Sequence, residues 1–346
     1  MYDLRDFITA VGEIVASHRL AEPGACRRWN WQDKRSTRDL SLNPYGCADA
    51  ANILYTVGSF PQDPQERSSW ISVLRGLQDE ESGMFRDPTH HEIHTTAHCI
   101  AALELFDARP ERPLAKLSGY RDPEEMVSFL EELDWKHNPW GESVRGAGIY
   151  SALVLNREVT QEWMDSYYAW LFENSDPESG LFRRGCVDPV EASGVESFFP
   201  HLGGTFHYLF NMEYDRRPLR YPKAMIDTCL HIFNRRPFQV RSPDRSTGLP
   251  FGKNVGFAEI DWVFCLTRSL RQCGHRYEDC HKALVAFTAE YVPFLLGLDP
   301  ERDDGLNDLH SLFGALCCLA ELQTALPGQI ITERPLKLVL DRRPFI

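Results

Sequence analysis

The chain alternates between two kinds of predicted helix. One kind is less apolar, and the other is apolar on nearly all of its faces. In most runs apolar residues recur at positions i, i+3, i+4 and i+7, as in Leu309, Leu312 and Leu316, which is the spacing of an α-helix. The less apolar helices are predicted at residues 4–17, 66–77, 123–134, 160–173, 222–235 and 279–297. Helices richer in Ala, Cys and Leu are predicted at residues 46–58, 93–106, 145–155, 195–212, 257–271 and 309–325. Alternation with a period of two is confined to short pieces, so the sequence predicts an all-α fold.

A polar turn separates the two helices of each pair. Its clearest copies are LQDEESGMF (77–85), ENSDPESGLF (173–182), RSPDRSTGLPF (241–251) and LDPERDDGLND (298–308), and weaker copies lie at 31–44 and 133–143. Asp, Ser, Pro and Gly supply the turn chemistry in these segments. The repeat therefore predicts six helical hairpins.

Six hairpins are the number that closes a ring, so we expect a single (α/α)6 toroid domain over residues 1–346. The less apolar helices would form the outer ring. The helices rich in Ala and Cys would form the inner ring, where both faces of a helix are buried. An open solenoid of helix pairs is the competing architecture, but it needs polar capping repeats and none is evident.

Composition indicates which binding partners and which cellular compartment are expected for this chain. The net charge of −13 disfavours nucleic acid and anionic membranes as partners. The amphipathic N-terminal segment is not a signal peptide, and no window approaches the ~18 consecutive apolar residues of a transmembrane helix. Ten cysteines occur without a CxxC pair, as expected for small buried side chains in a reducing compartment. We therefore expect a cytoplasmic protein.

In such a ring all inner helices begin on the same face. The binding or catalytic site is therefore expected at the opening on that face, the mouth of the ring. Convergent polar groups in a concave site are the usual sign of a binding site. Asp261 and Glu196 are the candidate acid and base, with His94 and His310 as proton-transfer groups. The candidate substrate-binding residues are Tyr45, Asp49, His90, Arg145, Arg183, Glu191, Trp262 and Asn307.

A metal is the alternative interpretation of these side chains. Asp261 and Cys265 are spaced i, i+4, and His310 begins the next inner helix, so the three could bind zinc with the fourth position open to substrate. His94 and His98 share the same spacing, but His98 is also explained as a buried, hydrogen-bonded core residue. We expect no cofactor, with zinc at Asp261, Cys265 and His310 as the alternative.

The repeat resembles that of the terpenoid cyclase and protein prenyltransferase toroids. Gln78, Gly83 and Phe85 correspond to the glutamine and the glycine–aromatic pair of that repeat. EIDWVFCLTRSL and NDLHSLFGALCCLAEL resemble the zinc-bearing segments of prenyltransferase β subunits, where Asp261 and His310 match two ligands. Val263 stands where the cysteine ligand is expected, and Cys265 follows two residues later. The resemblance implies a toroid and isoprenoid chemistry.

The architecture is also similar to that of toroid glycoside hydrolases and polysaccharide lyases. An isoprenoid pocket requires an apolar lining, whereas the predicted mouth is polar and suits a sugar. We therefore favour a carbohydrate-active enzyme, a hydrolase or lyase of uronate-containing oligosaccharides. Arg145 and Arg183 would hold the uronate, and Tyr45 and Trp262 would stack on a sugar ring. Isoprenoid chemistry, another sugar-modifying toroid enzyme and a non-catalytic sugar-binding toroid remain the alternatives.

Overall fold

Helices make up most of the structure, as predicted. The computed structural model describes residues 1–32, 37–188, 194–240 and 249–346. The more buried helices are α2 (Pro44–Thr56), α4 (Glu92–Leu105), α6 (Pro139–Leu155), α8 (Val195–Tyr214), α10 (Ala258–Gln272) and α13 (Leu309–Ala325). The peripheral helices are α1 (Arg5–His18), α3 (Pro64–Gly76), α5 (Pro123–Glu132), α7 (Gln161–Glu173), α9 (Pro222–Asn234) and α11 (Tyr277–Leu296).

The remaining elements are short. They are the 3-10 helix η1 (Ala115–Arg121) and the helices α12 (Asp304–Asn307) and α14 (Val339–Arg342). Strand β1 (Tyr2–Asp3) pairs in parallel with β4 (Ile330–Ile331), and β2 (Gln239–Val240) pairs antiparallel with β3 (Leu249–Pro250). The first pair ties the N-terminal segment to the segment that follows α13.

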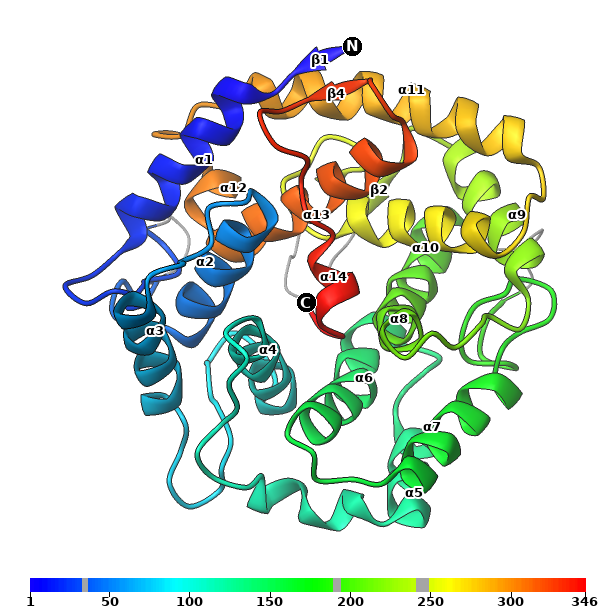
Figure 1. Ribbon diagram of the computed structural model, residues 1–346. Helices are drawn as coiled ribbons and strands as arrows, with labels where there is room; N and C mark the ends of the chain where they lie inside the picture. Colours follow the sequence, from blue (N-terminus) through cyan, green and yellow to red (C-terminus); the bar gives the residue numbers. More distant parts are fainter. Residues whose placement is uncertain (33–36, 189–193, 241–248) are drawn as a thin grey trace.

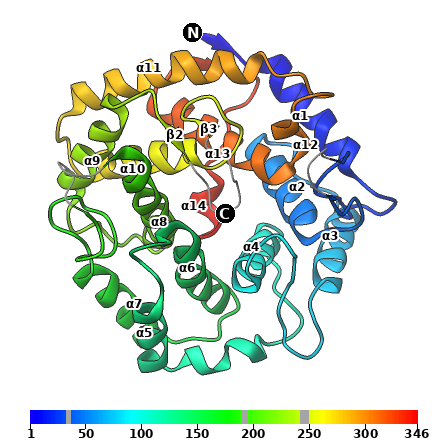
Figure 2. The same cartoon turned by 180° about the vertical axis from the view of Figure 1, so that it is seen from behind.

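The six buried helices contact one another in cyclic order. Helix α2 packs on α4, α4 on α6, α6 on α8, α8 on α10 and α10 on α13, and α13 packs back on α2. Figure 1 shows these helices around a common centre with the peripheral helices outside them, and Figure 2 shows the same arrangement from behind.

Local sequence sets where these helices begin. Asn43 accepts a hydrogen bond from the Gly46 N–H at the start of α2, and Asp63 and Asp122 cap α3 and α5 in the same way. Helix α6 starts six residues before the predicted boundary at residue 145. Pro139 explains the difference, because proline is favoured in the first turn of a helix, where its missing N–H costs nothing.

Small residues let neighbouring inner helices approach closely. A Cβ atom at Gly146 of α6 would lie 2.0 Å from the Tyr208 hydroxyl of α8, so only glycine fits there. On α4 and α13 nearly every side chain is buried, which agrees with helices that are apolar on all faces. No helix in the described ranges is both long and apolar enough to cross a membrane.

The C-terminal residues fill the centre of the ring. Helix α14 and the chain end lie between the inner helices in both views (Figures 1 and 2). The Pro344 carbonyl accepts hydrogen bonds from Ser151 Oγ at 2.6 Å and from Asn211 Nδ2 at 2.8 Å. The Phe345 ring lies 5.0 Å from the His94 ring. The segment after α14 therefore forms part of the core and borders the polar cluster described next.

Candidate functional site

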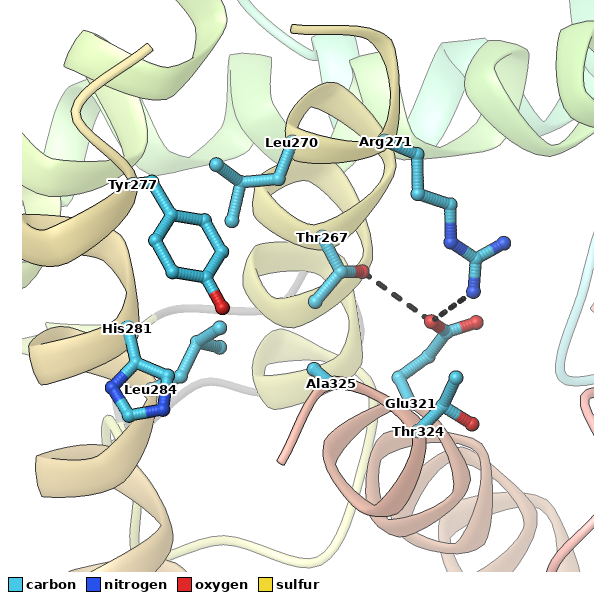
Figure 3. A pocket seen from close by; sticks show the side chains of 9 residues that line it. All are labelled: Thr267, Leu270, Arg271, Tyr277, His281, Leu284, Glu321, Thr324 and Ala325. Atoms are coloured by element: carbon cyan, nitrogen blue, oxygen red, sulfur yellow. Dashed lines mark hydrogen bonds and ion pairs between the residues drawn. The ribbon is translucent and has the colours of Figure 1, made fainter. Parts of the chain in front are cut away.

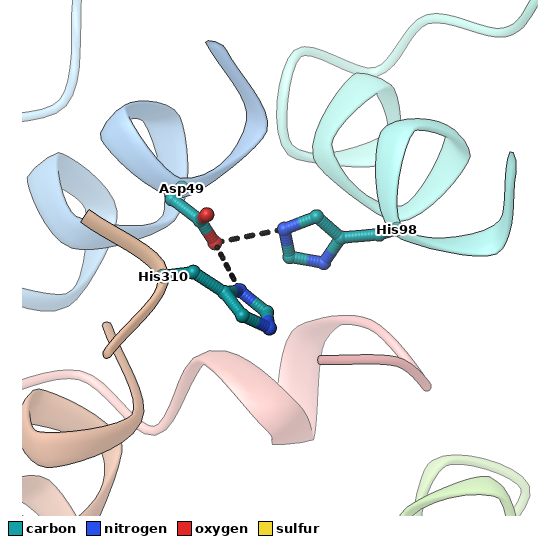
Figure 4. A group of neighbouring side chains, drawn as sticks. All are labelled: Asp49, His98 and His310. Atoms are coloured by element: carbon teal, nitrogen blue, oxygen red, sulfur yellow. Dashed lines mark hydrogen bonds and ion pairs between the residues drawn. The ribbon is translucent and has the colours of Figure 1, made fainter. Parts of the chain in front are cut away.

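A buried group of one carboxylate and two imidazoles joins three inner helices. Asp49 comes from α2, His98 from α4 and His310 from the first turn of α13 (Figure 4). Asp49 Oδ1 lies 2.8 Å from His98 Nε2 and 3.2 Å from His310 Nδ1. The two histidines therefore converge on the same carboxylate oxygen.

Tyr45 holds the rings of this cluster in place. It stacks on His98 and His90 with ring centroids 5.0 and 4.3 Å apart, and it meets His310 edge-on at 4.7 Å. Its hydroxyl group is hydrogen-bonded to Nδ1 of His94. Tyr45, His90, His94 and His310 were all predicted site residues, and the structure brings them together around Asp49.

A buried ion pair orients the start of α13. Arg28 donates to both oxygens of Asp308, at 2.8 and 2.9 Å. Asp308 in turn caps α13 by accepting a hydrogen bond of 3.1 Å from the His310 N–H. The Arg28 guanidinium also lies 5.2 Å from the Tyr45 ring centroid. Arg28 thereby fixes the positions of two members of the cluster.

Burial and neighbouring charge set the protonation states. Burial alone would raise the pKa of Asp49, but His310 and His98 stabilise its anion and hold the pKa below its ordinary range. Burial lowers the pKa of His98 to about 4 and that of His94 well below its ordinary value. At neutral pH the cluster therefore combines an ionised Asp49 with neutral imidazoles at His94 and His98.

Asp261 on α10 is a second buried carboxyl group, and its pKa is displaced in the opposite direction to that of Asp49. Neither of its oxygens has a hydrogen-bond partner in the structure. Burial and the nearby Glu259 raise the pKa of Asp261 well above its ordinary range. A Cβ atom built on Gly203 of α8 would lie 2.8 Å from Oδ2 of Asp261 and 2.9 Å from the Trp140 ring. The protonated carboxyl group therefore lies where α8, α10 and the start of α6 meet.

Other predicted site residues are engaged elsewhere. Trp262 is fully buried, and its indole N–H donates to the Cys229 carbonyl of α9 at 2.8 Å. Arg183 forms an ion pair with Glu131 at the end of α5, away from the cluster. The structure therefore places Trp262 and Arg183 against the peripheral helices and outside the histidine cluster.

Of the remaining predicted residues, two form contacts of their own and two lie outside the described part of the chain. The Asn307 side chain accepts hydrogen bonds from the backbone N–H groups of residues 30 and 31, so it fastens a loop. Arg145 pairs with Glu142 at 2.6 Å in the first turn of α6. Glu191 and the side chain of Glu196 lie outside the described residues.

The predicted zinc set is not the one that the structure assembles. Cys265 is buried in apolar packing, which raises its pKa well above the ordinary value and keeps the thiol protonated. His310 instead joins Asp49 and His98. Within the described part of the chain, these three form the group whose ligand atoms, all within 4.8 Å of one another, could hold a metal ion.

Sequence reasoning predicted Asp49 as a site residue but did not place His98 beside it. His98 was considered as a metal ligand with His94 and was also explained as a core residue. Following the inward face by i+4 steps from Tyr45 to Asp49 and from His94 to His98 would have placed His98 at the site. No local sequence pattern indicated Arg28 as a site residue, because its partner Asp308 is 280 residues away in the sequence.

A surface pocket of about 240 Å³ lies near the other ends of α10 and α13 (Figure 3). Glu321 lies on its wall, where its carboxylate oxygens approach Thr267 Oγ1 at 3.3 Å and Arg271 Nη2 at 3.6 Å. An α-helix rises about 1.5 Å per residue, so Glu321 lies about 16 Å along α13 from His310. This pocket is therefore separate from the histidine cluster.

Comparison of the chain with protein-family models, with curated proteins and with solved structures gave no significant match.

Proposed function

We propose that the chain is a six-hairpin (α/α)6 toroid with the active site of a carbohydrate-active enzyme, a hydrolase or lyase, at the mouth of the ring, where the inner helices begin. The cyclic contacts of the inner helices support the architecture. Buried polar side chains on the inner helices support the location. Among them are Asp49 on α2, His94 and His98 on α4, His207 on α8, Asp261 on α10 and His310 on α13.

One observation carries the enzymatic part of the proposal. Two buried carboxyl groups on inner helices have pKa values displaced in opposite directions, Asp49 downward and Asp261 upward. Such a pair supplies a proton donor and an ionised carboxylate at the same pH, which is the usual requirement for cleaving a glycosidic bond. In this proposal Asp261 acts as the general acid. Asp49, together with its histidines, is the ionised group that accepts a proton.

The surrounding side chains favour a hydroxylated substrate over a hydrocarbon. The Ser143 hydroxyl lies 2.7 Å from His207 Nδ1, and Tyr45 and Trp140 are aromatic rings close to the polar groups. A hydrocarbon ligand would also leave the buried polar atoms of Asp49, His98 and Asp261 that lack a partner unsatisfied, at a cost of about 1–3 kcal/mol for each. The polar lining therefore favours a sugar substrate over an isoprenoid.

The substitution Asp261→Asn tests the role of the acid. Purified protein is incubated with neutral and uronate-containing oligosaccharides, and reducing ends and the ultraviolet absorbance of unsaturated uronates are measured. We expect the variant to lose activity by about 10²–10⁴-fold, the usual contribution of a general acid. Its Tm should stay close to that of the wild type, because asparagine has the same shape and Asp261 has no hydrogen bond to lose.

The exposed Asp6 provides a matched control, since Asp6→Asn removes a carboxylate from the surface of α1. This variant should retain full activity. Wild-type protein inactive on every saccharide would contradict the carbohydrate function. An active Asp261→Asn variant would leave that function standing and remove Asp261 from the mechanism.

A further inference from the structure

We infer that Asp49, His98 and His310 form a binding site for a divalent first-row transition-metal ion with one coordination position open. This inference goes beyond the proposed function and does not depend on it. Two imidazoles and a carboxylate are the ligand set of many catalytic zinc and non-haem iron sites. The site joins α2, α4 and α13, and it lies where the first and last inner helices of the ring meet.

The distances fit an ion with little rearrangement. Ligand atoms about 2.0–2.1 Å from a tetrahedral ion lie about 3.3–3.4 Å apart. The Oδ1 atom of Asp49 is now 2.8 Å from His98 Nε2 and 3.2 Å from His310 Nδ1. The first distance needs to widen by about 0.5 Å and the second by about 0.2 Å. All three ligand atoms already lie within 4.8 Å of one another.

A purely structural hydrogen-bonded group explains the geometry less well. Both histidines approach one oxygen of Asp49, while Oδ2 is buried and has no hydrogen-bond partner. His98 Nδ1 is likewise buried and without a partner. A group selected only for stability would distribute its donors over both oxygens, since an unsatisfied buried polar atom costs about 1–3 kcal/mol. Convergence of the three side chains on one point is what a metal site requires.

The ligand side chains are held in place by their surroundings. Tyr45 packs on the rings of both His98 and His310, and Asp308 fixes the backbone at His310. Such support keeps ligands in the geometry that the ion requires. The three side chains leave the fourth position of a tetrahedral ion to a non-protein ligand, which is typical of catalytic sites.

The charge around the site favours an anion at that open position. Arg28 and Arg343 are both buried and act electrostatically on Asp49. Arg28 is already balanced by Asp308. A divalent cation bound by one carboxylate beside Arg343 therefore leaves excess positive charge. A hydroxide ion or a carboxylate ligand at the fourth position would reduce this excess.

The first test measures metal content. The protein is stripped with a chelator, loaded separately with Zn²⁺, Fe²⁺, Mn²⁺ or Co²⁺, dialysed and analysed by elemental mass spectrometry. We expect about one tightly held ion per chain. Asp49→Asn removes the negative charge of the carboxylate ligand, and His98→Asn and His310→Gln remove the proposed nitrogen ligands, so each variant should bind at least 10-fold more weakly. His207→Asn is the matched control, a buried inner-helix histidine outside the site, and it should bind as the wild type does.

A second measurement on the wild type decides the question if these variants fail to fold. Co²⁺ bound by two nitrogens and an oxygen gives visible ligand-field bands of tetrahedral intensity, and acetate should shift them by entering the open position. Binding should also raise Tm in proportion to the logarithm of the free metal concentration. Wild-type protein that binds none of the four ions, or ligand variants that bind as tightly as His207→Asn, would overturn the site. Bands that acetate leaves unchanged would overturn the open position.

Discussion

Buried histidines are the most consequential residues of this chain at the level of single side chains. Within the described residues five of them lie on the inner helices, namely His94, His98, His201, His207 and His310, and burial lowers the pKa of several. A histidine that is neutral in the folded chain must be protonated when the chain unfolds in acid, so each one makes stability depend on pH. His207 is the clearest case, because it lies outside the proposed metal site and contacts a single hydroxyl group, that of Ser143.

His207 should make the protein sensitive to mild acid. Burial lowers its pKa to about 3 in the folded chain, against an ordinary value of 6.5. Below pH 6.5 the unfolded chain binds a proton that the folded chain does not, so stability falls as the pH falls. Between pH 7 and pH 4.5 this one residue removes about 2.5 kcal/mol from the free energy of unfolding. Urea unfolding at a series of pH values should show His207→Asn losing that much less than the wild type.

Ser143→Ala separates the titration of His207 from its hydrogen bond. This variant should be less stable at pH 7 by about 1 kcal/mol, the usual value of one hydrogen bond. It should keep the wild-type dependence on pH, since the imidazole remains buried. If the profile of His207→Asn ran parallel to that of the wild type, the histidine would be protonated in the folded chain and the argument would fail.

At the level of elements, the turn between α3 and α4 shows how a hairpin is fastened. Gln78 is buried, and its Nε2 donates to the carbonyls of Gly83 at 2.9 Å and Arg112 at 2.8 Å. Its Oε1 accepts from the backbone N–H groups of Glu111 and Arg112. One side chain thus satisfies four backbone groups in two separate loops. The glutamine singled out in the sequence repeat therefore has a structural role in this chain.

Replacing this residue tests that role. Gln78→Ala should lower the free energy of unfolding by about 2–4 kcal/mol, because it leaves four backbone groups without partners. Urea unfolding should show a lower midpoint at an unchanged m-value. Gln65→Ala, an exposed position in α3, is the control and should change stability by less than about 0.5 kcal/mol. A small effect of Gln78→Ala would mean that water replaces the glutamine in the turn.

The helices themselves were predictable from the sequence, and the contacts between them were less so. Among the described residues, the periodicity located the twelve longest α-helices, since burying one face requires apolar residues every third or fourth position. It placed the start of α6 too late, because Pro139 and Gly141 were read as a turn. Trp262 was assigned to the mouth from its position near a helix start. Its orientation depends on Phe233, 29 residues earlier, and a local pattern does not reveal such a contact.

At the level of the whole molecule, the ring is completed by residues that the repeat does not contain. The inner helices surround a space that six regular hairpins would leave open. Arg343, Phe345 and Ile346 are almost completely buried there. Nothing in the periodicity of the hairpins predicted this, because the segment lies outside every repeat and its partners come from α4, α6, α8 and α13. The segment joins the inner helices into a single core.

Phe345 should therefore control the stability of the whole ring. Its side chain is fully buried and packs against the rings of His94 on α4 and Phe210 on α8, two inner helices that both contact α6. Phe345→Ala should cost about 3–5 kcal/mol, as expected for a large cavity in a core. Phe172→Ala, at a half-exposed position on α7, should cost less than about 1 kcal/mol. If the chain is one domain, tryptophan fluorescence and far-ultraviolet circular dichroism will report the same unfolding midpoint in both variants. Two separate midpoints, or a Phe345→Ala variant as stable as Phe172→Ala, would show that the hairpins are stable without the segment that fills the ring.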